Sequence, residues 1–167
     1  MSSVNQQNPV RVFVAHAFTD HDDYRRVFEY LESARNFFYR NVSVIQVPQP
    51  LDKEGARQEL RKQISLAEAV VVPAGVYREQ RELVDFEVTC AKGFDKPVIV
   101  LRTFGIAETL PVQLEALADE ILEWNERDLV DAIKRQARHE ESTRWDTVDF
   151  KLEDFEQFKL DKLNKDE

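Results

Sequence analysis

The sequence predicts an α/β fold in which helices cover both faces of a parallel β-sheet. Short runs of apolar residues, many of them β-branched, alternate with segments whose apolar residues recur at helical spacing. The runs are apolar at nearly every position, as expected for strands that are buried on both faces. The chain has 167 residues, which is enough for one domain with a sizeable core and a short extension.

The apolar runs place the strands in order. Residues 10–17 (VRVFVAHA) form the first strand, and residues 41–47 (NVSVIQV) form the second, which stops at the prolines of PQP. Residues 69–75 (AVVVPAG) and 96–102 (KPVIVLR) form the third and fourth, and residues 120–124 (EILEW) are expected to add a short edge strand. Strands that alternate with helices pair in parallel, because each return to the sheet is made through a helix.

Helix signals fill the intervals between these strands. The first helix lies within residues 19–35, with Thr19 or Asp20 as its N-cap and acidic residues in its first turn. The second helix carries an apolar stripe at Ala56, Leu60, Ile64 and Ala67. Residues 81–94 and 126–138 are predicted to form the last two helices.

This order of elements is typical of a flavodoxin-like, doubly wound sheet. In such folds, ligands bind outside the carboxyl ends of the strands, at the point where the strand order reverses. The segments expected at that edge are residues 16–18, 48–51, 74–77 and 102–105. A binding site is therefore predicted among these four segments.

Glu87 departs from the amphipathic pattern of the helix at residues 81–94. At about 100° per residue, one arc of this helix holds the apolar residues Leu83, Phe86, Cys90, Ala91 and Phe94. Glu87 projects into the middle of that arc, away from the other charged side chains. An isolated buried carboxylate is costly, so Glu87 needs a partner, an unusual pKa or a cleft. We expect its carboxylate to open to a cleft beside residues 16–18.

Composition excludes several classes of partner and compartment. The formal net charge of −9 argues against nucleic acid or an anionic membrane as the main partner. No apolar run approaches the length of a membrane span, and the polar start MSSVNQQNP does not resemble a secretory signal. The single cysteine, Cys90, cannot form an internal disulfide and is expected to be a buried apolar residue. The sequence therefore predicts a cytoplasmic protein.

Several kinds of chemistry lack their sequence motifs. The three histidines are scattered and no Cys/His cluster exists, so no metal site is predicted. The chain contains no GxGxxG, GxxxxGK[ST] or GxSxG pattern, which argues against Rossmann-type cofactor binding, P-loop chemistry and a nucleophile elbow. The third strand ends in Pro73, Ala74 and Gly75, where a two-component receiver domain would place an aspartate.

The final segment differs in composition from the rest of the chain. We divide the sequence into an α/β domain at residues 1–139 and an acidic extension at residues 140–167. The extension lacks glycine and proline, and aromatic residues such as Trp145 and Phe150 interrupt its charges. Aromatic residues are enriched in the cores of interfaces. The extension is expected to pack on its own domain, with docking to a partner as the alternative.

The order and spacing of five motifs resemble those of TIR-like domains, in particular the bacterial branch found in Thoeris-type antiphage systems. The motifs are VRVFVAHAFTDHDDY, NVSVIQVPQPL, LRKQISLAEAVVVPAGVY, LVDFEVTCAKGFDKPVIVLR and the pair FG. Together they span residues 10–105, most of the predicted domain. The resemblance implies a TIR-like parallel sheet.

The resemblance also implies an activity. TIR domains that act as enzymes cleave the nicotinamide–ribose bond of NAD with a glutamate on the helix after the third strand, often within a W-x-x-x-E pattern. Glu87 matches the glutamate position and Leu83 the tryptophan position, while the serine-aromatic-serine motif of the first strand reads Ala15, His16, Ala17. NAD would be a substrate rather than a cofactor. The product would be an ADP-ribose-type signal that activates a separate effector protein.

The chemistry of the cleavage suggests roles for the neighbouring residues. Breaking the glycosidic bond builds positive charge on the ribose, which the Glu87 carboxylate would stabilise in a water-poor cleft. His16, Ala17 and Phe18 are predicted to line the substrate site together with Tyr77. In this interpretation His16 hydrogen-bonds a hydroxyl or phosphate, and Phe18 and Tyr77 stack on a ring of the substrate.

Structural roles remain open for the same residues. Glu87 can pair with a buried cation or cap a loop, His16 can be a hydrogen-bonded structural histidine, and Phe18 can be a packing residue. The alternative function is a catalytically silent TIR-like module that binds a nucleotide or a protein partner. Nucleoside deoxyribosyl transfer, which also places a carboxylate beside ribose, is a third hypothesis. Assembly into a homo-oligomer is compatible with each of them.

Overall fold

Five strands form one parallel sheet in the computed structural model, which describes residues 3–47 and 49–140. The strands are β1 (Val10–Val14), β2 (Tyr39–Asn41), β3 (Ala69–Pro73), β4 (Val98–Leu101) and β5 (Glu120–Leu122). They pair in the order β2-β1-β3-β4-β5, with parallel partners throughout. This is the flavodoxin-like order, and its switch point lies between β1 and β3. The predicted fold class is confirmed.

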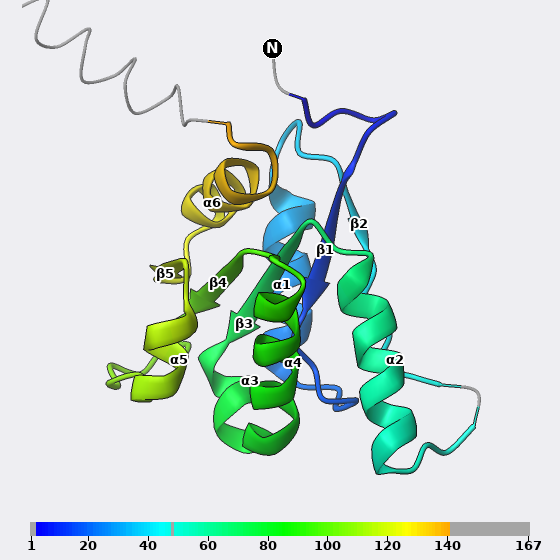
Figure 1. Cartoon of the computed structure of the whole chain (residues 1–167). Helices are drawn as coiled ribbons and strands as arrows, with labels where there is room; N and C mark the ends of the chain where they lie inside the picture. The colour runs from blue at the N-terminus through cyan, green and yellow to red at the C-terminus, as the bar shows by residue number, and fades with distance from the viewer. Residues whose placement is uncertain (1–2, 48, 141–167) are drawn as a thin grey trace, which may run out of the picture.

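Six helices follow the strands in the described part of the chain, one after each strand except β3, which two helices follow (Figure 1). They are α1 (Asp22–Ser33), α2 (Lys53–Ser65), α3 (Ala74–Glu79), α4 (Arg81–Gly93), α5 (Val112–Leu117) and α6 (Glu126–Arg138). In Figure 1, α4 lies in front of the sheet and α1 lies behind it. The carboxyl ends of the central strands point toward the bottom of that view, where the loops that follow them gather.

Each face of the sheet contributes to its own apolar core, because successive side chains of a strand point to opposite faces. On one face, Phe13 and Val70 pack with residues of α2 and α4, such as Leu60 and Val88. On the other face, strand residues such as Val12 and Val71 join apolar side chains of α1 and α6. Every residue of β3 is buried, as expected for the central strand. The sheet is thus covered on both sides, as its mainly apolar central strands predict.

The second strand is shorter than its sequence predicts and begins earlier. Residues 41–47 were expected to form it, but β2 ends at Asn41. Beyond that point, side-chain oxygens accept hydrogen bonds from the backbone. The Ser43 N–H donates to Asn41 Oδ1 over 2.9 Å, and the Val44 N–H donates to Gln63 Oε1 over 2.9 Å. A side-chain amide from α2 therefore takes the place of a neighbouring strand at Val44.

The other boundaries differ from expectation mainly at the carboxyl edge. β1 ends at Val14 rather than at residue 17: the Ala15 N–H still donates to the Val71 carbonyl over 2.9 Å, but the N–H groups of His16 and Ala17 turn toward Glu87. β3 ends at Pro73, and α3 follows at once. The N-cap of α1 is His21, whose Nδ1 accepts from the Asp23 N–H over 2.9 Å, so the expected caps Thr19 and Asp20 were wrong.

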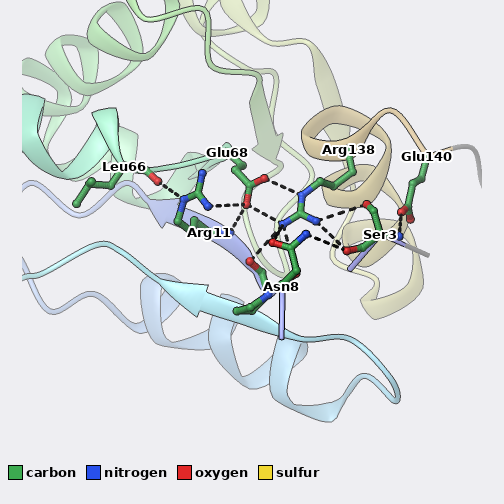
Figure 2. Close-up of polar contacts among 8 residues, drawn as sticks. Ser3, Asn8, Arg11, Leu66, Glu68, Arg138 and Glu140 are labelled. Carbon is green, nitrogen blue, oxygen red and sulfur yellow. Dashed lines mark hydrogen bonds and ion pairs between the residues drawn. The ribbon is translucent and has the colours of Figure 1, made fainter. Parts of the chain in front are cut away.

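A polar network, the Arg138 network, joins both ends of the described chain near the amino ends of β1 and β3 (Figure 2). Arg138, the last residue of α6, donates from Nε to Glu68 Oε1 over 2.7 Å and from Nη1 to the Ser3 carbonyl over 3.0 Å. The Arg11 N–H donates to Glu68 Oε2 over 2.8 Å. Only 10% of the Arg138 side chain and 16% of the Glu68 side chain are exposed. The ion pair is therefore largely shielded from solvent, and the Arg138 cation helps hold the pKa of Glu68 below its usual value against the effect of burial.

Two further predictions concern membrane spans and the C-terminal extension. None of the helices in residues 3–47 and 49–140 has the length and hydropathy that a membrane span requires. The predicted extension at residues 140–167 lies outside the described residues except for Glu140, whose carboxylate accepts a hydrogen bond from the Ser3 N–H.

Candidate functional site

Glu87 lies at the switch point of the sheet, where α4 passes the carboxyl end of β1. Its Oε1 accepts hydrogen bonds from the backbone N–H groups of Ala17, over 3.0 Å, and His16, over 3.3 Å. The buried side of α4 consists of Val84, Glu87, Val88 and Ala91. The carboxyl group is therefore the polar centre of an otherwise apolar helix face. Glu87 therefore lies beside residues 16–18, as predicted.

The expected opening of Glu87 to a cleft is not present. The side chain is 0% exposed, and Oε2 is buried without a hydrogen-bond partner among the described residues. Burial raises the pKa of Glu87 from 4.5 to about 8, although the two backbone N–H groups act in the opposite direction. Near neutral pH the group is thus mainly a protonated acid. Because Oε1 accepts both N–H groups, the proton belongs on Oε2.

His16 is a second fully buried polar residue at the same place. The Phe18 N–H donates to His16 Nδ1 over 2.8 Å, so this nitrogen carries no proton. Nε2 therefore carries the proton and donates to Gln63 Oε1 over 3.0 Å. Burial lowers the pKa of His16 from 6.5 to about 4, despite the opposing effect of Gln63. The imidazole is neutral, and both of its nitrogens are engaged within the protein.

Gln63 is a site residue that the sequence analysis missed. Besides the bond to His16, its side chain accepts from the Val44 N–H and donates to the Val44 carbonyl over 3.0 Å. It thus joins α2, the loop after β2 and the loop after β1. A signal for it existed: Gln63 lies three residues after Leu60 and next to Ile64, on the apolar side of α2. It is a polar residue on an apolar helix face, as Glu87 is.

The loop that Glu87 and His16 hold has an unusual backbone. Ala17 and Phe18 have positive φ angles of 50° and 57°, which residues other than glycine rarely adopt. Such residues cost on the order of 1–3 kcal/mol each and persist where surrounding contacts fix them. The bonds from Glu87 to the Ala17 N–H and from His16 to the Phe18 N–H supply such contacts. Phe18 is partly buried, and its ring meets the His16 ring edge to face at 5.1 Å.

Tyr77 occupies a different part of the carboxyl edge. It lies in α3, is 1% exposed and lines a cavity of about 410 Å³ together with Arg78 and Arg81. No hydrogen bond of ordinary geometry reaches its hydroxyl among the described residues, but burial and the nearby Asp85 carboxylate raise its pKa. The structure therefore brings together Glu87, His16, Ala17 and Phe18, whereas Tyr77 faces this separate cavity.

The closed cluster has a defined chemical capacity. It presents one carboxyl group and one neutral imidazole in an apolar environment, with two backbone N–H groups fixed on the carboxyl oxygen. An ionised Glu87 there would interact strongly with a nearby positive charge, because little solvent screens it. In the part of the chain that the structure describes, no group of three or more His, Cys, Asp or Glu side chains is arranged to hold a metal ion.

Comparison with known proteins leaves the fold as the firm assignment. No model of a known protein family matches the chain, and no curated protein matches its sequence. The strand order and the parallel pairing define a flavodoxin-like α/β fold.

Proposed function

We propose that this chain is a TIR-like enzyme that cleaves the nicotinamide–ribose bond of NAD, with Glu87 as its catalytic carboxylate. The observation that carries the proposal is the position of Glu87, whose Oε1 contacts the backbone N–H groups of His16 and Ala17 at the β1/β3 switch point. Ligands of doubly wound sheets bind at this point. The order of sequence motifs that resembles TIR-like domains gives Glu87 the same role.

The proposed reaction depends on the charge of Glu87. Departure of nicotinamide leaves positive charge on the ribose, and an ionised carboxylate in an apolar cleft stabilises that charge. Nicotinamide leaves as a neutral molecule, so no second acid is needed. The pyridinium ring of bound NAD is itself cationic and would favour ionisation of Glu87, whose pKa of about 8 reflects its burial.

Access to Glu87 requires a movement of the residues that cover it, because the Glu87 side chain is 0% exposed. In this proposal the loop at residues 16–18 moves, and the backbone N–H groups of His16 and Ala17 leave Oε1. The positive φ angles of Ala17 and Phe18 favour such a movement, since the closed conformation is held by contacts rather than by backbone preference. In this proposal, binding of NAD replaces those contacts.

The same burial supports a second candidate, a catalytically silent TIR-like module. Glu87 does not line the cavity that Tyr77 lines, and its Oε1 already serves as an acceptor for two backbone N–H groups. A carboxylate with that role stabilises a loop. This module would bind a nucleotide or partner without turnover.

Release of nicotinamide from NAD, followed by chromatography, separates the two candidates. We expect turnover by the natural chain and loss of at least about a hundredfold in Glu87→Gln, because the amide preserves shape but carries no charge. Glu82→Gln is the matched control, since Glu82 lies on the same helix with 76% of its side chain exposed. Equal turnover by both variants excludes Glu87 as the catalytic group. Binding of NAD without nicotinamide release identifies the silent module.

The pH dependence of turnover gives an independent check. Because the catalytic form is the ionised one, kcat/KM should rise with pH and level off above about pH 8, the pKa of Glu87. A rate that falls as pH rises through this range contradicts a carboxylate role.

The proposed biological setting is antiphage defence through a soluble ADP-ribose-type signal. Bacteria that carry this chain together with its effector should survive phage challenge, and Glu87→Gln should remove the protection. Survival that is unchanged by Glu87→Gln contradicts a signal made by this site.

A further inference from the structure

Two adjoining cavities lie at the carboxyl edge of β3, β4 and β5, apart from Glu87. One has a volume of about 830 Å³ and is lined by residues 102–109 with Glu123 and Trp124. The other has a volume of about 410 Å³ and is lined by Tyr77, Arg78 and Arg81 among others. Both include Thr103, Glu108 and Thr109, so they meet along the loop between β4 and α5. We call them together the β4 cleft.

The smaller half of the β4 cleft presents two arginines. Arg78 Nη1 lies 2.6 Å from Glu108 Oε1, and Arg81 Nη2 donates to Gln113 Oε1 over 3.0 Å. A guanidinium has five N–H donors, so each arginine keeps donors for a further acceptor. The Arg78 side chain is 63% exposed. Glu108 therefore acts as a counterion that an anionic ligand can replace, and arginine is well suited to phosphate.

The larger half presents an aromatic pair. Trp124 is fixed by its Nε1–H, which donates to the Arg102 carbonyl over 2.6 Å, and it meets Phe104 edge to face at 5.6 Å. The Arg26 guanidinium lies 3.6 Å from the centre of the Phe104 ring and covers one of its faces. Phe104 is nevertheless 42% exposed. Aromatic rings that are held in place but exposed at a concave surface can stack on a planar ring with little loss of entropy.

We propose that the β4 cleft binds a nucleotide, with its base against Phe104 and Trp124 and its phosphates on Arg78 and Arg81. The cleft lies at the carboxyl ends of the strands, the side of a parallel sheet that binds ligands, although it is beside β4 rather than at the β1/β3 switch point. The chemistry fits as well, since one half of the cleft is aromatic and the other offers guanidinium donors. This site is separate from the proposed NAD chemistry. Arg81 is the first residue of α4, so bound phosphate would contact the helix that carries Glu87.

Calorimetric titration of the full chain with three probes tests the proposal. ADP carries both the base and the phosphates, adenosine carries the base alone, and inorganic pyrophosphate carries the charge alone. We expect ADP to saturate one site and to bind more tightly than either fragment, because each half of the cleft contributes.

Three variants then assign the two halves. Arg78→Gln should weaken ADP and pyrophosphate by about tenfold, as expected for loss of a charge-assisted hydrogen bond. Glu108→Gln should strengthen both, because it removes the competing carboxylate. Phe104→Ala should weaken ADP and adenosine and leave pyrophosphate unchanged. The control is Arg40→Gln, which removes the same charge from β2 at the other edge of the sheet.

The opposite signs of Arg78→Gln and Glu108→Gln distinguish this site from a general effect of charge. Both side chains lie at the surface, so the variants should keep the melting temperature of the natural chain. Absence of saturable ADP binding overturns the proposal, as does ADP affinity that is unchanged in Arg78→Gln and Phe104→Ala. An effect of Arg78→Gln without any effect of Phe104→Ala refutes the nucleotide assignment.

Discussion

The buried carboxyl group of Glu87 should make the stability of the protein fall as the pH rises through neutrality. Its pKa is about 8 in the folded protein, against an ordinary value of 4.5 in the unfolded chain. Between these values the unfolded chain has released the proton while the folded protein retains it. The unfolded state thus binds fewer protons, so the free energy of unfolding decreases with pH in this window. The stabilising contribution is complete below pH 4.5 and is lost by about pH 8.

His16 has the opposite effect over a lower range. Its pKa is about 4 in the folded protein, against an ordinary value of 6.5. Below pH 6.5 the unfolded chain takes up a proton that the folded protein does not, so the contribution of His16 is present above pH 6.5 and is lost as the pH falls toward 4. The two effects oppose each other in their shared range. Only the effect of Glu87 remains between pH 6.5 and about pH 8.

The size of the effect follows from that window. Each pH unit is worth about 1.4 kcal/mol for one group, so a window of about 1.5 units gives a loss of about 2 kcal/mol. Glu87→Gln should remove this loss, because the amide resembles the protonated acid and does not titrate. Glu82→Gln on the exposed side of α4 should keep the slope of the natural chain.

Urea denaturation at several pH values between pH 6.5 and pH 8 provides the measurement. The quantity to compare is the difference in free energy of unfolding between the natural chain and Glu87→Gln. This difference cancels the contributions of all histidines, which both proteins share. Parallel pH profiles for the two proteins would refute the assignment of a protonated, buried Glu87.

Further predictions concern the contacts that hold the site and the chain ends. Gln63→Leu should lower the free energy of unfolding by about 2–3 kcal/mol in urea denaturation, because it leaves the His16 Nε2–H and backbone groups buried without partners; a loss below about 0.5 kcal/mol would show that water replaces the amide. Arg138→Met should cost about 3 kcal/mol by the same measurement, since Glu68 stays largely buried without its main cation. Arg127→Met, an exposed control on the same helix, should change stability by less than about 0.5 kcal/mol, and equal losses in the two variants would contradict a special role for Arg138.

The alternation of apolar runs and helical segments was sufficient to predict the sheet. The burial of each strand and helix determines which of its own residues are apolar, so the pattern can be recognised within each segment. Short elements were less predictable. The helix α3 spans six residues directly after β3, which is too short for apolar periodicity to be recognised. The end of β2 depends on Gln63, a residue 19 positions after Val44 that supplies the hydrogen bonds of a missing strand neighbour. A hydrogen bond from a residue so distant in the sequence cannot be predicted from the local sequence of the strand.

The candidate site was predictable in part for a similar reason. Glu87 is conspicuous in the sequence because a charge interrupts an apolar helix face, and the structure places its carboxyl group at the predicted loop. That the group is closed from solvent could not be inferred, since closure depends on the positive φ angles of Ala17 and Phe18. Nothing in the letters Ala and Phe indicates that conformation. Tyr77 was assigned to this site by its position after the third strand, but α3 directs it to the β4 cleft.

The Arg138 network has a consequence for how the domain opens. Arg138 at the end of α6 shares Glu68, the residue just before β3, with Arg11 of β1, and it also holds the Ser3 and Pro9 carbonyls. Fraying of either end is opposed by the other, because release of one end removes hydrogen-bond partners from the other. Amide hydrogens near Asn8 and those in the last turn of α6 should therefore exchange as one cooperative unit, with a protection that reflects the shared ion pair.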